Sequence, residues 1–171
     1  MRILGLDPGS RFTGYGLIEH RAGRMTCLRQ GRISCGTGEM CARLALIHSE
    51  LSAIIRDGAP DAVSVESVFV HRNIQSALTL GQARGAALAA VGQAGLQIRE
   101  YAPAAIKSAV VGNGRAEKQQ VQHMVGILLG VPLDAMASDA ADALAIAICH
   151  AHHSGTPGGT SLPAGMRWGR R

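Results

Sequence analysis

The chain has 171 residues, of which 47% are apolar and 17% charged, and its net charge is +5 with a pI near 9.5. This composition excludes a disordered chain, and the length predicts one folded domain rather than two. The positive charge suits a polyanionic partner such as nucleic acid.

The apolar runs, the cysteines and the histidines further limit the class of protein. No apolar run reaches 18 residues and no signal-like segment opens the chain, so we expect a cytoplasmic protein without a membrane partner. The four cysteines include no C-x-x-C pair, which argues against a zinc site. Three histidines close the last predicted helix, where the helix dipole favours them, and we do not interpret them as metal ligands.

The predicted elements alternate between strands and helices along the chain. Three strands joined by Gly-bearing turns come first, and then helices alternate with two further strands. Strands are expected at 2–7, 14–20, about 25–34, 61–66 and 96–101, and helices at about 44–57, 73–94, 115–129 and 138–153. This order predicts an α/β fold with a mixed five-stranded sheet and helices on both faces. Residues 1–153 form the expected domain, and the Gly/Pro-rich, basic segment 154–171 is expected to be a disordered tail.

Acidic residues mark the ends of two predicted strands. Asp7 ends the first strand in "GLDPG", and Glu66 ends the strand "DAVSVE". A strand that ends in Asp before Pro-Gly is typical of a nucleotide-phosphate loop as well as of a metal-dependent nuclease, so this motif alone does not choose between them. Ligand sites of open α/β sheets lie at the carboxyl ends of parallel strands. If the two strands are neighbours, both acids lie at the same edge.

The last predicted helix supplies two more acids. Asp139 and Asp142 are three residues apart in "SDAADALAIAICHAHH", so they share a face near the helix start. Each acid alone has a simple structural explanation, as a turn starter, a strand end or a favourable charge in a first helical turn. Together, four acids at one edge would repel one another unless divalent cations neutralise them. Carboxylate sites suit Mg²⁺ or Mn²⁺, and two such ions can drive phosphodiester hydrolysis. The pattern therefore predicts a two-metal nuclease centre.

Four stretches of the chain carry a resemblance to a known family. These are "ILGLDPGSRFTGYG", "VESVFVHRNIQSALTLGQARG", "VVGNGRAEKQQVQHMV" and "SDAADALAIAICH". In this order the chain closely resembles the RuvC-type Holliday junction resolvases, crossover junction endodeoxyribonucleases with a ribonuclease-H-like fold. The resemblance implies a Mg²⁺-dependent homodimer that cuts two opposed strands of a four-way DNA junction symmetrically and leaves 5′-phosphate nicks. It also implies work beside the RuvAB branch-migration complex in recombination and repair.

The resemblance also implies roles for single residues. Asp7, Glu66, Asp139 and Asp142 match the family's metal-binding acids, and some relatives carry His where Asp139 stands. Lys107 and Lys118, the only lysines of the chain, match positions near the scissile phosphate. Phe69 matches an aromatic residue that stacks on unpaired bases at the junction centre. Arg72, Asn73 and Arg84 are further candidate DNA contacts, suggested only by their proximity to these motifs.

Two questions stay open at this point. The Ala/Gly-rich helix carries a stripe of mostly small residues (Ala77, Gly81, Gly85, Leu88 and Gly92) that could pack on the protein's own sheet or form a dimer contact. One alternative to a resolvase is a catalytically silent junction-binding protein, which would carry the same motifs. A second alternative is an actin-like phosphotransferase. It shares the strand-Asp-x-Gly start, but it needs a second phosphate loop and about twice this length.

Overall fold

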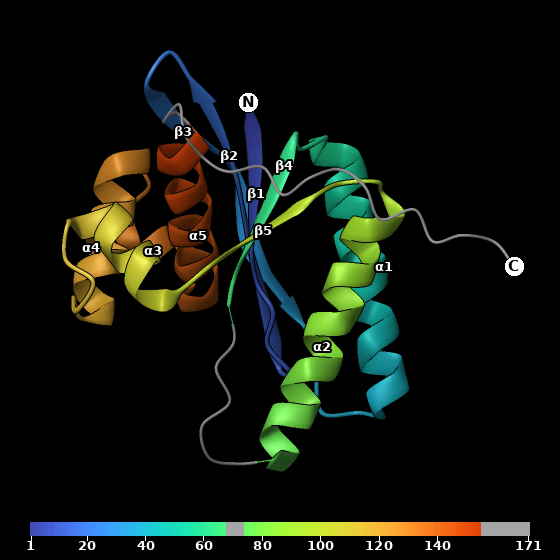
Figure 1. Cartoon of the computed structure of the whole chain (residues 1–171). Helices are drawn as coiled ribbons and strands as arrows, with labels where there is room; N and C mark the ends of the chain where they lie inside the picture. The colour runs from blue at the N-terminus through green and yellow to red at the C-terminus, as the bar shows by residue number, and fades with distance from the viewer. Residues whose placement is uncertain (68–73, 155–171) are drawn as a thin grey trace, which may run out of the picture.

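The computed structural model describes residues 1–67 and 74–154, and all that follows concerns these residues. A central sheet separates two layers of helices (Figure 1). Its five strands are β1 (Arg2–Asp7), β2 (Phe12–Arg21), β3 (Arg24–Ser34), β4 (Ala62–Glu66) and β5 (Ile98–Tyr101). The predicted mixed five-stranded sheet is thereby confirmed.

The strand order across the sheet is β3-β2-β1-β4-β5. The first three strands pair antiparallel through short turns, whereas β4 and β5 are parallel to β1 and are reached through helical crossovers. The parallel register pairs Leu6 with Val65, so Asp7 and Glu66 follow side by side at the carboxyl ends of β1 and β4. The sequence left open whether these two strands are neighbours, and the register shows that they are.

The helices agree with the prediction except that one more helix is present and some bounds differ. They are α1 (Met40–Gly58), α2 (Ile74–Gln93), α3 (Pro103–Val111), α4 (Lys118–Leu129), α5 (Ser138–Ser154) and a short 3-10 helix η1 (Leu133–Ala135). The sequence analysis missed α3, a nine-residue helix with Pro103 in its first turn, where proline is well tolerated. Helix α4 begins at Lys118 rather than near residue 115, because Glu117 and Gln120 form a capping box there. Ser154 is the last residue of α5, and the rest of the expected tail lies outside the described residues.

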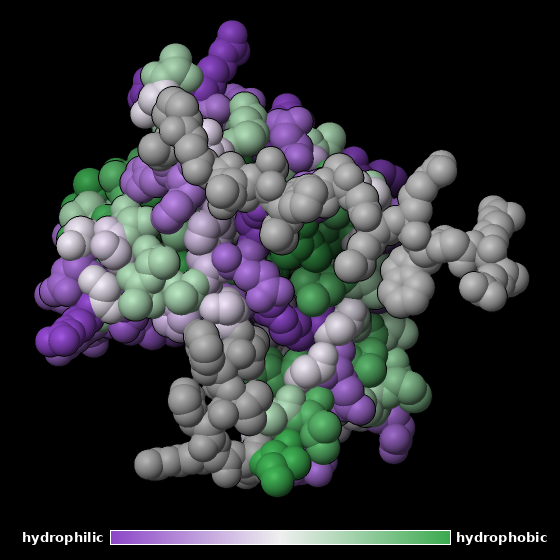
Figure 2. Space-filling view, viewed as in Figure 1, coloured by the Kyte–Doolittle hydropathy of each residue, from purple (hydrophilic) through white to green (hydrophobic). Residues whose placement is uncertain are grey.

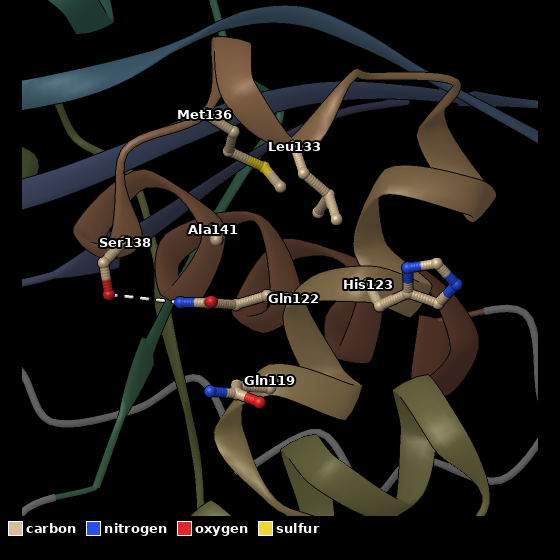
Figure 3. Close-up of a pocket in the computed structure, with 7 residues that line it drawn as sticks. All are labelled: Gln119, Gln122, His123, Leu133, Met136, Ser138 and Ala141. Atoms are coloured by element: carbon tan, nitrogen blue, oxygen red, sulfur yellow. Dashed lines mark hydrogen bonds between the residues drawn. The ribbon is translucent and has the colours of Figure 1, made fainter.

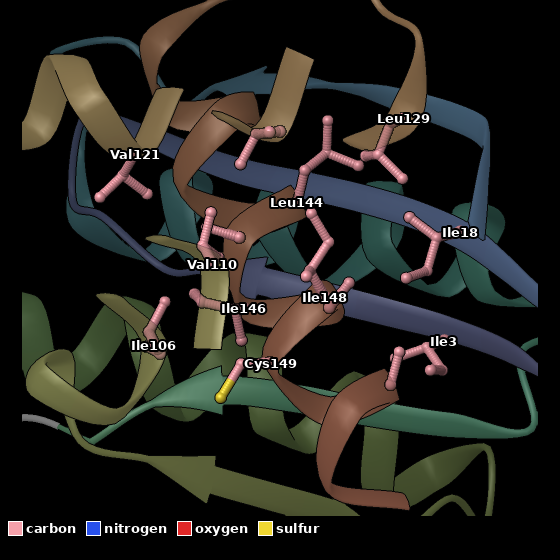
Figure 4. Packing of buried hydrophobic residues seen from close by; sticks show 14 of the residues in the cluster. Ile3, Ile18, Ile106, Val110, Val121, Leu129, Leu144, Ile146, Ile148 and Cys149 are labelled. Atoms are coloured by element: carbon pink, nitrogen blue, oxygen red, sulfur yellow. The ribbon is translucent and has the colours of Figure 1, made fainter. Parts of the chain in front are cut away.

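Each face of the sheet has its own apolar core. Helices α1 and α2 cover one face, where Ile47 and Leu51 pack with strand residues such as Leu4 and Val65. Helices α3, α4 and α5 cover the other face, and Figure 4 shows α5 between the sheet and the other two helices. Every residue of α5 from Ala143 to Ala151 is buried, so its orientation is set by packing along its whole length.

Two glycines let α5 lie unusually close to the strands. A Cβ on Gly5 would stand 2.0 Å from the carbonyl oxygen of Ala143, and a Cβ on Gly14 would stand 2.0 Å from that of Asp139. No side chain fits there, so glycine is required at both positions. At the other end of α5, the Tyr101 hydroxyl and His150 Nδ1 are 2.8 Å apart, which joins α5 to β5. These contacts fix where the first turn of α5 meets the sheet edge.

None of the helices within residues 1–67 and 74–154 is both long enough and apolar enough to span a membrane.

Candidate active site

Four acids from three elements come together at the carboxyl edge of the sheet. Asp7 and Glu66 end the neighbouring strands β1 and β4, while Asp139 and Asp142 lie in the first turns of α5. All four side chains are partly buried. The charges of Glu66, Asp139 and Asp142 all act on Asp7, which therefore lies within the electrostatic reach of every other acid.

A cavity of about 230 Å³ opens between these acids and the two lysines of the chain. It is lined by Asp7, Glu66, Pro103, Ile106, Lys107, Lys118, Val121, Asp142, Ala145 and Ile146. Lys107 comes from α3 and Lys118 from the first turn of α4, so the two helices bring one cation each to the acids. Lys118 Nζ donates a hydrogen bond of 2.5 Å to Asp142 Oδ2. Asp139 stands beside this cavity, with its backbone against Gly14.

The acids change one another's protonation. Burial, followed by the charges of Asp142, Glu66 and Asp139, raises the pKa of Asp7 from 3.8 to about 6, and the charge of Lys118 opposes the rise. Burial and the charge of Asp142 also raise the pKa of Glu66, against the opposing charges of Lys107, Lys118 and Arg84. The side chains around Asp7 and Glu66 therefore do not fully compensate the charge of these two carboxylates.

Lys118 shows the reverse effect. Burial lowers its pKa, but the hydrogen bond to Asp142 and the charges of Asp142, Asp7 and Asp139 raise it by more, so its pKa lies above the ordinary value. The ammonium therefore stays charged beside Asp142.

The donor set fits a hard divalent cation. The cavity lining includes three side chains that can bind a metal, the carboxylates of Asp7, Glu66 and Asp142, and oxygen ligands are those that Mg²⁺ and Mn²⁺ prefer. Within the described residues, no three His, Cys, Asp or Glu side chains are already arranged to hold one metal ion.

Two supporting contacts near the acids could not be expected from the sequence. The Arg32 guanidinium on β3 stacks 4.4 Å from the Phe12 ring centre, and its Nη1 lies 3.8 Å from Asp139 Oδ2. Gln122 on α4 donates a hydrogen bond of 3.1 Å to the hydroxyl of Ser138, the first residue of α5. Both contacts depend on tertiary pairing and leave no local sequence signal.

Gln122 belongs to a second hollow next to the acids. It is lined by Gln119, Gln122, His123, Leu133, Met136, Ser138 and Ala141 (Figure 3). Figure 3 shows Gln122 pointing across it from α4 toward Ser138. Since Ser138 immediately precedes Asp139, this hydrogen bond helps to hold the acidic end of α5 against α4.

The other predicted DNA contacts fall into two groups. Phe69, Arg72 and Asn73 lie outside the described residues, so their roles stay predictions. Arg84 lies within α2, where only 13% of its side chain is exposed and its guanidinium contacts the Glu66 carbonyl and the Glu100 carboxylate.

A mixed five-stranded sheet with this strand order and acids at its carboxyl edge defines a ribonuclease-H-like α/β protein. The family model described as "Crossover junction endodeoxyribonuclease RuvC" matches residues 3–150. The chain belongs to this family of endodeoxyribonucleases, as the four sequence motifs implied.

Individual relatives agree with this assignment. The chain is 54% identical over 151 residues to crossover junction endodeoxyribonuclease RuvC of Trichlorobacter lovleyi, a match that covers 88% of this chain and 84% of the relative. It is 52% identical over 152 residues to the protein of the same name from Dichelobacter nodosus, covering 89% and 86%. It also superimposes on the solved structure of T. thermophilus RuvC in complex with a Holliday junction substrate. That match has a TM-score of 0.84 and 33% identity, and covers 90% of this chain and 94% of the other.

Proposed function

We propose that this chain is a structure-specific endonuclease that resolves four-way DNA junctions. It makes paired symmetric nicks by hydrolysis, leaves 5′-phosphate ends, and serves homologous recombination and DNA repair in the cytoplasm. The observation that carries the proposal is the convergence of Asp7, Glu66 and Asp142 with Lys107 and Lys118 around one cavity. A family member with 33% identity and the same fold was solved with a Holliday junction substrate, which supports the choice of DNA.

The four acids would hold the metal of this reaction, which we propose to be Mg²⁺, two ions per subunit, with Mn²⁺ able to substitute. Bound divalent ions supply Lewis acidity that activates water and stabilises the leaving oxygen. Asp7 and Glu66 hold one side of the site from rigid strand ends, and Asp139 and Asp142 close it from α5. The raised pKa of Asp7 supports this assignment, because burial and the neighbouring acids disfavour the charged carboxylate and an added cation would stabilise it.

The two lysines would act on the phosphate. Lys107 and Lys118 approach the acids from separate helices, so a scissile phosphate in the cavity would lie between an ammonium and the carboxylates. An ammonium beside the phosphate attracts the DNA strand and offsets the charge that develops in the transition state. In this proposal, the Lys118 ammonium leaves Asp142 and pairs with the phosphate instead. The Asp142 carboxylate is then free to bind metal.

Replacement of Glu66 tests these assignments. Glu66→Gln keeps the size of the side chain but removes its charge, so we expect junction binding to stay within about twofold and nicking to fall by about 10³-fold, since a bound metal contributes several kcal/mol. Gel-shift affinity in EDTA and single-turnover nicking in Mg²⁺ measure the two quantities. Glu19→Gln, on the far end of β2, is the matched control. Nicking by Glu66→Gln at the wild-type rate would remove Glu66 from the site. A wild-type protein that binds the junction without nicking it would favour the catalytically silent alternative.

Paired nicks require two active sites, and we propose a homodimer that uses the exposed side of α2. A Cβ added at Gly81, Gly85 or Gly92 would meet no atom of a neighbouring described element within 4 Å, so the glycines of the stripe do not pack on the protein's own sheet. The helix instead turns Ala83, Ala87, Ala90 and Val91 inward. Ile74 and Leu78 are 79% and 58% exposed, and Figure 2 shows the hydrophobic surface at this end of α2.

This dimer is tested by a charge placed on the exposed side of α2. We expect Leu78→Glu to convert a dimer into a monomer in analytical ultracentrifugation, because burying a carboxylate in an apolar contact is unfavourable and two-fold symmetry repeats the cost in both subunits. Leu46→Glu, on the exposed side of α1, is the matched control and should remain dimeric. A wild-type monomer at micromolar concentration, or a Leu78→Glu dimer, would rule out this surface.

Further assignments follow from the family and remain proposals. Phe69 would stack on unpaired bases at the junction centre, with Arg72 and Asn73 as neighbouring DNA contacts. The nuclease domain would comprise residues 1–153, and the RuvAB branch-migration complex would be its partner on the junction.

A further inference from the structure

Arg84 is the only charged residue of α2, and its guanidinium is engaged inside the protein. Its Nη1 donates a hydrogen bond of 2.7 Å to the backbone carbonyl of Glu66. Its Nη2 lies 2.8 Å from Glu100 Oε1 on β5, and only 13% of the Arg84 side chain is exposed. One guanidinium thus joins α2 to the ends of two parallel strands.

The Glu66 peptide needs such a contact because it lies where the sheet stops. The ladder between β1 and β4 ends at Leu6 and Val65, one residue before Glu66. On the other side, Glu66 pairs with Tyr101, and the next amide, that of Ser67, donates to the Tyr101 carbonyl at 2.8 Å. The hydrogen bond from Arg84 to the Glu66 carbonyl therefore also holds this last strand residue in place. The side chain of Glu66 lines the cavity.

The chemistry of the two contacts indicates which one matters. Glu100 is 52% exposed, and an ion pair with an exposed partner contributes little. A mostly buried guanidinium that donates to a carbonyl forms a charge-assisted hydrogen bond, which is stronger and more directional. Glu100 mainly orients the planar guanidinium, while the bond to Glu66 sets the position of the peptide.

We infer that Arg84 is a positioning residue for the nuclease reaction: it holds the Glu66 peptide so that the Glu66 carboxylate stays directed into the acid cavity, and it does not contact DNA. The inference rests on the proposed function for its catalytic consequence. It replaces the expectation from sequence that Arg84 is a DNA contact.

Three variants test this role: Arg84→Met, Arg84→Lys and Glu100→Gln, with Arg56→Met as the matched control. Arg56 is a well exposed arginine on α1 whose Nε lies 3.3 Å from Oδ1 of its neighbour Asp57. Junction affinity is measured in EDTA, and single-turnover nicking at saturating protein is measured across a Mg²⁺ titration. Hydrogen exchange of the Ser67 amide reports the strand end without any need for activity.

We expect Arg84→Met to bind the junction within about twofold of wild type but to nick it about 10–100-fold more slowly. A displacement of a catalytic group by about 1 Å slows a reaction by this amount. Half-maximal nicking should require several-fold more Mg²⁺, and the Ser67 amide should exchange faster. Arg84→Lys should recover part of the rate, since an ammonium can still donate to the carbonyl but lacks the fork that also reaches Glu100. Glu100→Gln should show the same changes in weaker form, and Arg56→Met none.

The opposite pattern would overturn the inference. Arg84→Met with weakened junction affinity and a wild-type rate at saturation would make Arg84 a DNA contact. Should Arg84→Met fail to fold, Arg84→Lys and Glu100→Gln decide: wild-type rates, Mg²⁺ dependence and Ser67 exchange in both would reject the role. If wild-type protein nicks no junction, the proposed function fails by itself, and Ser67 exchange alone still tests whether Arg84 holds the strand end.

Discussion

Asp7→Asn is expected to abolish nicking and to stabilise the metal-free protein at the same time. The substitution removes a metal ligand, so we expect the single-turnover rate to fall by about 10³-fold or more. It also removes a charge that the folded protein tolerates poorly. Since each unit of raised pKa costs the folded state about 1.4 kcal/mol when the group is charged, the gain at pH 7.5 in EDTA should be about 1–3 kcal/mol. Thermal unfolding followed by circular dichroism should show this as a rise in Tm of about 2–8 °C.

The pH dependence of this stabilisation has a definite sign. The pKa of Asp7 is 3.8 in the ordinary case and about 6 in the folded protein, so the folded state binds the proton more tightly than the unfolded state. Ionisation of Asp7 therefore destabilises the wild-type protein progressively as the pH rises from about 4 to about 6. The advantage of Asp7→Asn should be full above that window and shrink below it. The same proton competes with metal, so wild-type nicking should need more Mg²⁺ at pH 5.5 than at pH 7.5.

An exposed acid on η1 provides the control. Asp134→Asn should change neither the rate of nicking nor the melting temperature in EDTA. An Asp7→Asn protein that nicks junctions normally, or that melts at or below the wild-type temperature at pH 7.5, would show that Asp7 is an ordinary turn residue.

Gly14→Ala is expected to cause the second large loss, through the position of α5. The added Cβ would stand 2.0 Å from the Asp139 carbonyl oxygen and 2.6 Å from its carbonyl carbon, so the first turn of α5 must move away from β2. Asp139 and Asp142 would move with it. We expect nicking to slow by about 100-fold, the effect of a misplacement of about 1 Å. The free energy of unfolding should fall by about 1–3 kcal/mol, as in other overpacked sites.

Single-turnover nicking and urea denaturation measure these two effects. Gly38→Ala is the matched control, since a Cβ at that position meets nothing described within 4 Å. Wild-type nicking by Gly14→Ala would mean that the acids of α5 do not need their close approach to the sheet.

The positions of the four acids were predictable because local sequence patterns, strand ends and helical spacing, define them. Asp7 and Glu66 end apolar strands, and the spacing of Asp139 and Asp142 places them on one helical face. The sheet register then brings the strand ends together. The sequence alone left open whether the Ala/Gly stripe packs internally. Among the described residues its glycines face free space, whereas Leu88 packs against the core on the α1 and α2 side of the sheet.

Features that depend on tertiary pairing were not predictable. Helix α3 is short and carries no clear amphipathic period, so the element that holds Lys107 was missed. Arg84 lies in a motif near the site and was expected to reach DNA, yet its partners are a backbone carbonyl and Glu100, a contact that no sequence spacing encodes. The same holds for Arg32 beside Asp139 and for Gln122 beside Ser138.

We propose that these acids form a metal-dependent nuclease site for four-way junctions. The most direct measurement offers purified protein an end-labelled mobile four-way junction and a linear duplex of matched sequence, each with Mg²⁺ and with EDTA, and maps the cut ends. We expect ligatable nicks at symmetric positions on two opposed strands, on the junction and only with Mg²⁺. Equal cutting of the duplex, cutting in EDTA, or no cutting of either substrate would contradict it.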